Sequence, residues 1–268
     1  MNAGALAARL MAARDAAVCA PLPTAQQPGF SLADAYAVAD EIRSQRIARG
    51  EHPRGYKIGF TNRSIWPKYG VFAPVWAPMW DSTLTLLDGT ETQLSLAGLV
   101  QPRLEPEIVF GFARAPRAGM TEAELGACIE WVAHGFEIVH THFDGWRFQA
   151  PDTVADFGLH GRLLVGPRVA VADFADLSVE LAALHLQLLR GDAVVDDGKG
   201  SIVLDGPLNA LRVWVDAMAA QPQHWPIEGG DIVTTGTLTD AWPLTAGERW
   251  QTRLSDARLP GLRLSIEA

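Results

Sequence analysis

The sequence predicts a β-rich α+β fold, and three observations carry this prediction. Short apolar segments recur between residues 55 and 266, and turn-forming Gly, Pro and Asp residues separate them. Helical periodicity is confined to a few stretches, two of which lie near the N-terminus. Three glutamates, Glu105, Glu107 and Glu137, stand inside two of the apolar segments. Many strands with few helices are typical of an α+β fold.

The first helical stretches predict a small N-terminal helical lobe. Residues 3–18 are rich in Ala and Leu and read as a helix, and residues 19–29 hold three prolines and form a connection. Residues 31–50 predict a second helix that Ser31 can cap. We therefore expect a helical lobe over residues 1–52, followed by a second, β-rich unit over residues 53–268.

The β-rich part is expected to begin with a short strand at Gly55–Phe60. The pattern Thr121-x-x-Glu124 is a capping box and predicts a helix that runs to about His134, which would place this histidine at the helix end. The remaining expected elements are strands over residues 83–87, 104–110, 135–139, 184–188, 231–235 and 261–266 and a helix that begins at Pro207.

The glutamates are the most informative residues of the chain. Successive strand side chains point to opposite faces, so Glu105 and Glu107 share one face of their strand. Two carboxylates among apolar neighbours would repel each other and resist ionisation unless a cation lies between them. A hard divalent cation such as Mg²⁺ or Mn²⁺ prefers oxygen ligands. Together with Glu137 from a second strand, the pair therefore predicts a metal site, whereas an isolated Glu-x-Glu is usually a solvated edge-strand feature.

Composition narrows the partners and the compartment. The formal net charge is −9 and no block of Lys or Arg occurs, which argues against nucleic acid or an anionic membrane as a partner. No uninterrupted apolar stretch approaches the length of a membrane span. Cys19 and Cys128 are too few for a disulfide framework, so we expect a reducing, cytoplasmic location.

The order of five motifs resembles the fumarylacetoacetate hydrolase superfamily. The motifs, in chain order, are Gly55-Tyr56-Lys57-Ile58-Gly59, Glu105-x-Glu107, Glu137-Ile138-Val139, Asp152-Thr153-Val154-Ala155-Asp156 and Gly230-Asp231-Ile232-Val233-x-x-Gly236-Thr237. Within it, the chain is most similar to the branch of 2-keto-4-pentenoate hydratases and 4-oxalocrotonate decarboxylases. The resemblance implies a mixed β-sandwich roll or barrel with the helical lobe at its N-terminus. Members of the family associate, so it also implies a homo-oligomer.

The resemblance implies a role for each matching residue. Glu105, Glu107 and Glu137 would hold Mg²⁺ or Mn²⁺, which makes residues 53–268 a metal-binding catalytic unit. Lys57 matches the family lysine, which holds the substrate carboxylate or moves a proton, and a nearby dication would lower the pKa of this amine. The Gly236-Thr237 turn would close over the substrate with its N–H and hydroxyl groups.

Two departures from the family pattern bear on the substrate. Where the hydratases carry a catalytic aspartate, this chain has Val75, and Asp81 is the nearest acid that can replace it. Where the family has polar residues, the chain has Leu159 and His160, which makes His160 a candidate for a new polar group in the site. The departures suggest a 2-oxo acid with an aromatic or longer apolar tail.

Aromatic and cationic residues near these motifs are further candidates. Trp76 can line a substrate pocket or pack in the core. Arg103 shares its strand face with the glutamates, so it can balance their charge or meet a substrate carboxylate. His140 and His142 follow Glu137 at odd offsets and are expected to face away from the metal.

The expected function is that of a metal-dependent lyase that acts on a small 2-oxo or 2-hydroxy-dienoic acid in the catabolism of aromatic compounds. A hydratase is the first expectation. A 4-oxalocrotonate-type decarboxylase and an acylpyruvate-type C–C hydrolase are alternatives, because the same metal site serves all three reactions. A non-catalytic metabolite-binding protein or partner subunit is the alternative from another class.

Overall fold

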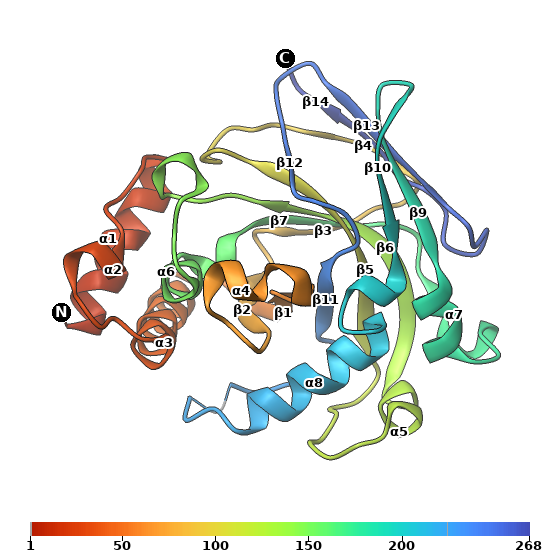
Figure 1. Ribbon diagram of the computed structural model, residues 1–268, viewed down its shortest axis with the longest axis horizontal. Helices are drawn as coiled ribbons and strands as arrows, with labels where there is room; N and C mark the ends of the chain where they lie inside the picture. Colours follow the sequence, from red (N-terminus) through yellow and green to blue (C-terminus); the bar gives the residue numbers. More distant parts are fainter. Residues whose placement is uncertain (1, 224) are drawn as a thin grey trace.

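Two sheets with helices at their margins make up the chain (Figure 1). The computed structural model describes residues 2–223 and 225–268. The strands of the large sheet are β1 (Pro53–Gly59), β2 (Val75–Trp80), β3 (Leu84–Leu86), β5 (Arg103–Phe112), β6 (Ile129–Val139), β7 (His160–Val165), β8 (Val169–Ala170), β11 (Ile232–Thr237) and β12 (Trp242–Pro243). Those of the small sheet are β4 (Glu91–Leu94), β9 (His185–Arg190), β10 (Ala193–Lys199), β13 (Arg249–Leu254) and β14 (Arg263–Ile266).

Both sheets are mixed, which confirms the β-rich α+β prediction. The large sheet has the order β2-β1-β11-β5-β6-β7-β3, with β12 beside β5 and β8 beside β6. The pairs β1–β11 and β3–β7 are parallel, and the other pairs of this sheet are antiparallel. The small sheet has the order β10-β9-β13-β14-β4. The large sheet curls, so strands that are not direct neighbours turn side chains toward a common interior.

The helices have the bounds α1 (Ala3–Ala16), α2 (Pro23–Gln26), α3 (Leu32–Ala48), α4 (Trp66–Tyr69), α5 (Glu122–Gly126), α6 (Ala150–Ala155), α7 (Leu177–Ala183) and α8 (Pro207–Ala219). Short 3₁₀ helices are η1 (Arg63–Ile65), η2 (Asp144–Trp146), η3 (Phe157–Leu159), η4 (Val171–Asp173) and η5 (Gly200–Ile202). None of the helices in the described ranges has the length and apolar character that a membrane crossing requires.

The two predicted N-terminal helices are confirmed as α1 and α3. Ser31 caps α3, and a reciprocal hydrogen bond with Asp34 completes a capping box. α1 packs against α3, and α3 packs against α6. Buried residues of these helices, such as Leu6 and Tyr36, share one apolar core with residues of the sheets and α8. The division of the chain into residues 1–52 and 53–268 stays a prediction.

The helix predicted from Thr121 to about His134 is wrong beyond its first turns. The capping box between Thr121 and Glu124 forms, but α5 ends at Gly126 and β6 begins at Ile129. The segment after Gly126 pairs with β5 along its length, so tertiary pairing outweighs the helical start. His134 therefore lies inside a strand, where its ring contacts the Glu107 carbonyl (3.1 Å) and the Thr252 hydroxyl (2.8 Å). Burial lowers the pKa of His134 to about 4.

Candidate metal centre and substrate cavity

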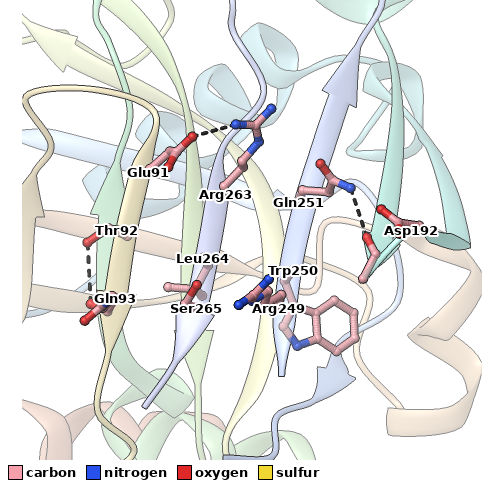
Figure 2. Close-up of a pocket in the computed structure, with 11 residues that line it drawn as sticks. Glu91, Thr92, Gln93, Asp192, Arg249, Trp250, Gln251, Arg263, Leu264 and Ser265 are labelled. Carbon is pink, nitrogen blue, oxygen red and sulfur yellow. Dashed lines mark hydrogen bonds and ion pairs between the residues drawn. The ribbon is translucent and has the colours of Figure 1, made fainter. Parts of the chain in front are cut away.

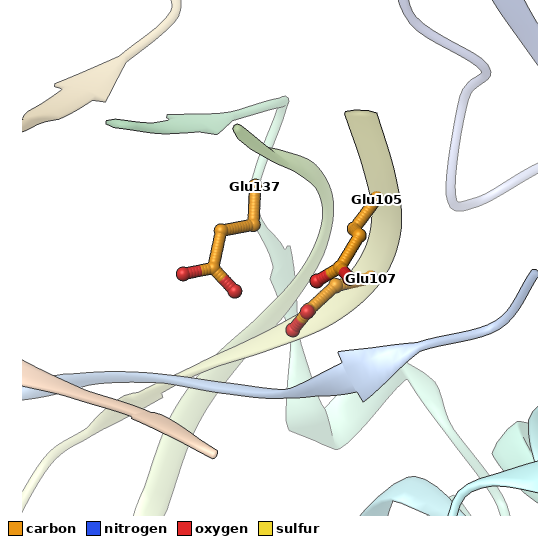
Figure 3. A group of neighbouring side chains, drawn as sticks. All are labelled: Glu105, Glu107 and Glu137. Carbon is orange, nitrogen blue, oxygen red and sulfur yellow. The ribbon is translucent and has the colours of Figure 1, made fainter. Parts of the chain in front are cut away.

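The three glutamates meet on the inner side of the large sheet. In the antiparallel pair β5–β6, Glu105 lies directly opposite Glu137, and Glu107 follows two residues later on the same face of β5. One carboxylate oxygen from each residue can be chosen so that all three lie within 4.8 Å of one another (Figure 3). Strand parity and cross-strand register therefore bring together the predicted ligand set.

The hydrogen bonding of these carboxylates is incomplete. Glu107 and Glu137 are fully buried. Among the described residues, Glu107 Oε1 has no hydrogen-bond partner, and Glu137 Oε2 faces the Lys57 amine at 3.1 Å. A buried, unpartnered carboxylate oxygen is costly unless a cation compensates it. Three clustered carboxylates, one of them with an unpartnered buried oxygen, fit a hard divalent cation, which takes oxygen ligands.

Burial and mutual repulsion govern how the carboxylates ionise. Burial raises the pKa of Glu105 to about 7, against the attraction of Lys57. Burial, followed by repulsion from Glu137 and Glu105, raises the pKa of Glu107 well above its ordinary value. Burial also opposes ionisation of Glu137, but Lys57 and a hydrogen bond from His160 outweigh it and lower the pKa. Ionisation of all three carboxylates would thus place more negative charge in the site than Lys57 alone can neutralise.

Lys57 lies beside the carboxylates, as the family motif implied. Its Nζ is 3.1 Å from Glu137 Oε2, although β1 and β6 are not neighbours in the sheet. Burial disfavours the charged amine, but Glu137, Glu105 and Glu107 together outweigh burial and raise the pKa of Lys57. A cation among the carboxylates would offset that effect, in the direction that the sequence predicted.

His160 contacts a predicted metal ligand. It is the first residue of β7, and its buried ring lies between Glu137 and Thr83. Because a carboxylate accepts, His160 Nδ1 donates to Glu137 Oε1 (2.8 Å), and Nε2 lies 2.9 Å from Thr83 Oγ1. Burial lowers the pKa of His160 to about 4, against the hydrogen bond with Glu137. The neutral ring orients Glu137 and does not line the cavity in front of it.

Gly236 orients a second predicted ligand. The register of β11 with β5 shifts between Thr234 and Thr237, and the backbone N–H of Gly236 donates to Glu107 Oε2 (2.9 Å). Gly236 has φ +98°, and a Cβ at this position would lie 1.9 Å from Thr61 Oγ1, so a glycine is required. Its N–H is thus committed to Glu107, whereas the resemblance implied a contact with the substrate.

A cavity of about 390 Å³ opens in front of the carboxylates. Lys57, Glu105, Arg103, Gly236 and Thr237 line it. The Arg103 guanidinium lies 4.1 Å from the centre of the Trp146 ring and donates to the Ala241 carbonyl. The cavity therefore presents cationic groups and hydroxyl side chains, among them Lys57, Arg103 and Thr237, beside the predicted metal ligand Glu105.

The two positions at which the chain departs from its family also line this cavity. Val75 and Leu159 both belong to the lining, as expected from the motif alignment. Leu159 has φ +63° and Gly158 beside it has φ +61°. A left-handed backbone at a non-glycine residue costs roughly 1–2 kcal/mol. Apolar side chains thus occupy positions where the sequence resemblance implied polar ones.

The structure does not bring Asp81 or Trp76 to the cavity. Asp81 follows the end of β2 that is distant from Val75, about 20 Å along an extended strand. It is exposed and accepts hydrogen bonds from the N–H groups of His52 and Ser82. Trp76 is buried, because its side chain points to the face opposite to Val75 and packs on Tyr36 at 4.9 Å between ring centres.

A larger hollow, of about 560 Å³, lies on the small sheet (Figure 2). Figure 2 shows that several of its polar groups pair with one another: Arg263 forms an ion pair with Glu91, and Gln251 donates to the Gly191 carbonyl. Its lining contains none of the three clustered glutamates. The cavity above the carboxylates is therefore the better candidate for chemistry.

Sequence reasoning missed the aromatic part of the cavity lining. Phe60, Tyr69, Trp146 and Phe148 all line the cavity, and they come from three separate segments. No periodic pattern joins these segments, so no signal in the sequence pointed to them. His140 and His142 are buried away from the cavity, and His142 donates to Asp156.

Comparison with known proteins gives close relatives over most of the chain. The chain is 32% identical over 240 residues to 2-hydroxyhexa-2,4-dienoate hydratase of Comamonas testosteroni, which covers 89% of this chain and 88% of that protein. It is 32% identical over 219 residues to 2-keto-4-pentenoate hydratase 2 of Dechloromonas aromatica, which covers 81% and 79%. No protein-family model matches the chain.

The fold also matches a solved structure. The 4-oxalocrotonate decarboxylase from Pseudomonas putida G7, complexed with magnesium and adipate, superposes with a TM-score of 0.89 at 23% identity. The match covers 98% of this chain and 97% of that one. At this identity the likeness establishes the fold, and it agrees with the roll of mixed sheets and the N-terminal helices described above.

Proposed function

Because the chain belongs to the 2-keto-4-pentenoate hydratase branch of the fumarylacetoacetate hydrolase superfamily, we propose that it is a divalent-metal-dependent lyase that hydrates a 2-hydroxy-dienoic acid in the catabolism of aromatic compounds. The observation that carries this proposal is the cluster of Glu105, Glu107 and Glu137 at the floor of a cavity that Lys57 also lines.

The carboxylates of Glu105, Glu107 and Glu137 would hold Mg²⁺ or Mn²⁺. The clustering of their oxygens, the unpartnered Glu107 Oε1 and the mutual repulsion of the carboxylates support this assignment. When bound, the cation supplies a positive charge that stabilises the developing negative charge on the 2-oxo or 2-hydroxy oxygen of the substrate.

The protein's own groups act around that charge. Lys57 is placed to carry a proton to or from the substrate chain, because its amine lines the cavity next to Glu105. Gly236 and His160 hold Glu107 and Glu137 in place through the hydrogen bonds described above. Arg103 and Thr237 are proposed to contact the polar groups of the substrate, since both line the cavity.

Decarboxylation of a 4-oxalocrotonate-type substrate is the second candidate, and Val75 favours it. A hydratase must add water, whereas loss of carbon dioxide needs only a sink for the electron pair and a proton donor for the carbon chain. A cavity lined by Val75 and Leu159 offers an apolar wall in place of an acid that could handle the added water. An acylpyruvate-type C–C hydrolase and a metabolite-binding subunit have no such specific support.

We also propose that the enzyme is a cytoplasmic homo-oligomer. Its two cysteines, Cys19 and Cys128, are unpaired, which suits a reducing compartment. Association is expected from the family resemblance, and gel filtration with light scattering would measure it.

The test is turnover of 2-hydroxypenta-2,4-dienoate, 4-oxalocrotonate and acetylpyruvate with Mg²⁺, with Mn²⁺ and after EDTA. We expect conversion of the first substrate, and its loss after EDTA. Glu107→Ala should lower activity by far more than tenfold. Glu130→Ala is the matched control, because Glu130 lies on β6 but is exposed. No metal-dependent conversion of any of the three, or a loss below tenfold in folded Glu107→Ala, contradicts the proposal.

A further inference from the structure

Four aromatic rings form a continuous wall along the cavity. This aromatic wall consists of Phe60, Tyr69, Phe148 and Trp146. The ring centres are 5.1 Å apart for Phe60 and Tyr69, 5.8 Å for Tyr69 and Phe148, and 5.9 Å for Phe148 and Trp146. These distances are those of favourable aromatic pairs. All four rings keep partial exposure, so the wall offers ring surface to an occupant and is not closed core packing.

The backbone presents these apolar side chains at a cost. In the described ranges, eight non-glycine residues have left-handed φ values, and three of them, Phe60, Trp146 and Leu159, line this cavity. A bulky residue adopts this conformation only where the surrounding structure imposes it, and such residues cluster at ligand sites. The concentration of strained apolar residues at one cavity therefore indicates a binding surface.

The size of the cavity also exceeds what a small acid needs. Its volume of about 390 Å³ lies within the range of roughly 300–1,000 Å³ that is typical of sites for drug-sized ligands. One end holds Lys57 and Glu105, and apolar residues such as Val75 and Leu159 add to the aromatic wall. A five-carbon acid held at the carboxylate end would leave much of this apolar surface in contact with water, which is unfavourable.

The cations beside the wall are already engaged with its rings. The Lys68 amine lies 5.1 Å from the centre of the Tyr69 ring, and Arg103 lies over Trp146 as described above. In a cation–π contact the negative face of the ring and the cation partly compensate each other, which is compatible with a neutral ligand. The wall is thus suited to an uncharged, flat group.

We propose that the substrate is a 2-oxo or 2-hydroxy-dienoic acid whose far end carries an aromatic ring. This inference rests on the proposed function. Its acid end occupies the region of Lys57 and Glu105, and its ring packs on the aromatic wall. A second carboxylate at the far end, which Lys68 and Arg103 would attract, is the competing possibility that the experiment must separate.

The test compares three saturated 2-oxo acids that differ only at carbon 5: 2-oxopentanoate, 2-oxohexanedioate and 5-phenyl-2-oxopentanoate. Their dissociation constants are measured by calorimetry on the Mn²⁺-loaded protein, without turnover. We expect the phenyl compound to bind about tenfold tighter than 2-oxopentanoate, as one aromatic contact pair plus apolar burial provides. Tighter binding of 2-oxohexanedioate, or equal binding of all three, overturns the inference.

Variants connect the preference to the wall. Phe148→Ala and the milder Tyr69→Leu should each reduce the ratio of phenyl to parent affinity several-fold. Phe72→Ala is the control, because this ring is 74% exposed, contacts Trp66 and does not line the cavity. An unchanged ratio in both wall variants contradicts the inference.

The outcomes separate this inference from the proposed function. Absence of metal-dependent turnover of every dienoate, with the phenyl preference intact, rejects the lyase but supports the aromatic site. Turnover of 2-hydroxypenta-2,4-dienoate without any phenyl preference supports the lyase and rejects the aromatic site.

Discussion

Replacing Glu107 by glutamine should stabilise the metal-free protein and abolish its response to metal. In the wild type, the Glu107 carboxylate is buried, repelled by Glu137 and Glu105, and has one oxygen without a hydrogen-bond partner. The amide of Glu107→Gln removes the charge, its oxygen can still accept the Gly236 N–H, and its NH₂ group can donate to the neighbouring carboxylates. The same change removes a charged metal ligand.

The neighbouring Glu105 sets the scale of the gain. Its pKa rises from the ordinary 4.5 to about 7, which corresponds to about 3 kcal/mol for an ionised carboxylate at high pH. Burial of the new amide NH₂ group offsets part of such a gain, so we take about 2 kcal/mol as the gain in Glu107→Gln. In a protein of this length, 1 kcal/mol shifts Tm by about 2–4 °C, so Tm should rise by about 4–8 °C in EDTA.

Metal should reverse the order of the two proteins. A ligand at one hundred times its Kd stabilises the folded state by about 2.7 kcal/mol, or about 5–11 °C in Tm. The wild type should gain this shift with Mn²⁺, whereas Glu107→Gln should gain little. Glu130→Gln, an exposed change on the neighbouring strand β6, should move Tm in neither condition.

The gain should also depend on pH in a defined direction. The folded state binds the Glu107 proton more tightly than the unfolded state does. The destabilisation by Glu107 is therefore absent below about pH 4.5 and grows as the pH rises. The difference in Tm between Glu107→Gln and the wild type in EDTA should therefore increase from pH 4.5 toward pH 7 and above, as Glu105 also ionises. Scanning calorimetry at several pH values measures this difference. A less stable Glu107→Gln at pH 8 in EDTA, or an undiminished Mn²⁺ shift, would refute the reasoning.

Three further predictions concern groups around the centre. His160→Leu should weaken Mn²⁺ binding by about tenfold or more, because the predicted ligand Glu137 loses its orienting donor, and His160→Asn should restore most of the affinity. Calorimetry measures the Kd of each variant, and equal values for both would exclude an orienting role. Burial lowers the pKa of His134 to about 4, so the stabilising contribution of the neutral ring is present above about pH 6.5 and is lost as the pH falls toward 4. His134→Gln should therefore flatten the acid side of the plot of Tm against pH, and an unchanged acid slope would contradict this prediction. Gly158→Ala should cost about 1–3 kcal/mol, because Gly158 has φ +61° and the added Cβ would lie 2.6 Å from Ala77 Cβ; chemical denaturation measures the loss, and a neutral effect would contradict the geometry.

The carboxylate centre could be predicted from sequence because it depends on short-range rules. The two-residue period of a strand places Glu105 and Glu107 on one face, and an apolar segment around Glu137 indicates a second strand. The structure adds the register that sets Glu105 opposite Glu137. The failure at residues 121–134 shows the limit of the same rules, since a correct capping box started a helix that long-range pairing with β5 ended after Gly126.

His160 was predicted to be a site residue, but the structure gives it a different role from the predicted one. The sequence indicated a polar side chain in an otherwise apolar segment and suggested a role in the cavity. The pairing of β7 with β6 instead places the ring behind Glu137, where it donates to a carboxylate oxygen. Asp81 is a different case. It is close to Val75 in sequence, but β2 is extended between them, so the two residues lie at opposite ends of the strand.

The substrate end of the cavity could not be predicted, and the physical reason separates it from the metal end. Phe60, Tyr69 and Phe148 come from a strand end, a single helical turn and a loop, so no common period relates them. Their approach depends on left-handed backbone at Phe60 and on the curl of the large sheet, and neither is encoded by a local sequence pattern. In this fold, strand parity therefore determines where charge is concentrated, whereas loop geometry determines which tail fits beside it. We therefore expect the loops to select the substrate tail, and for this chain the proposed determinant is the aromatic wall.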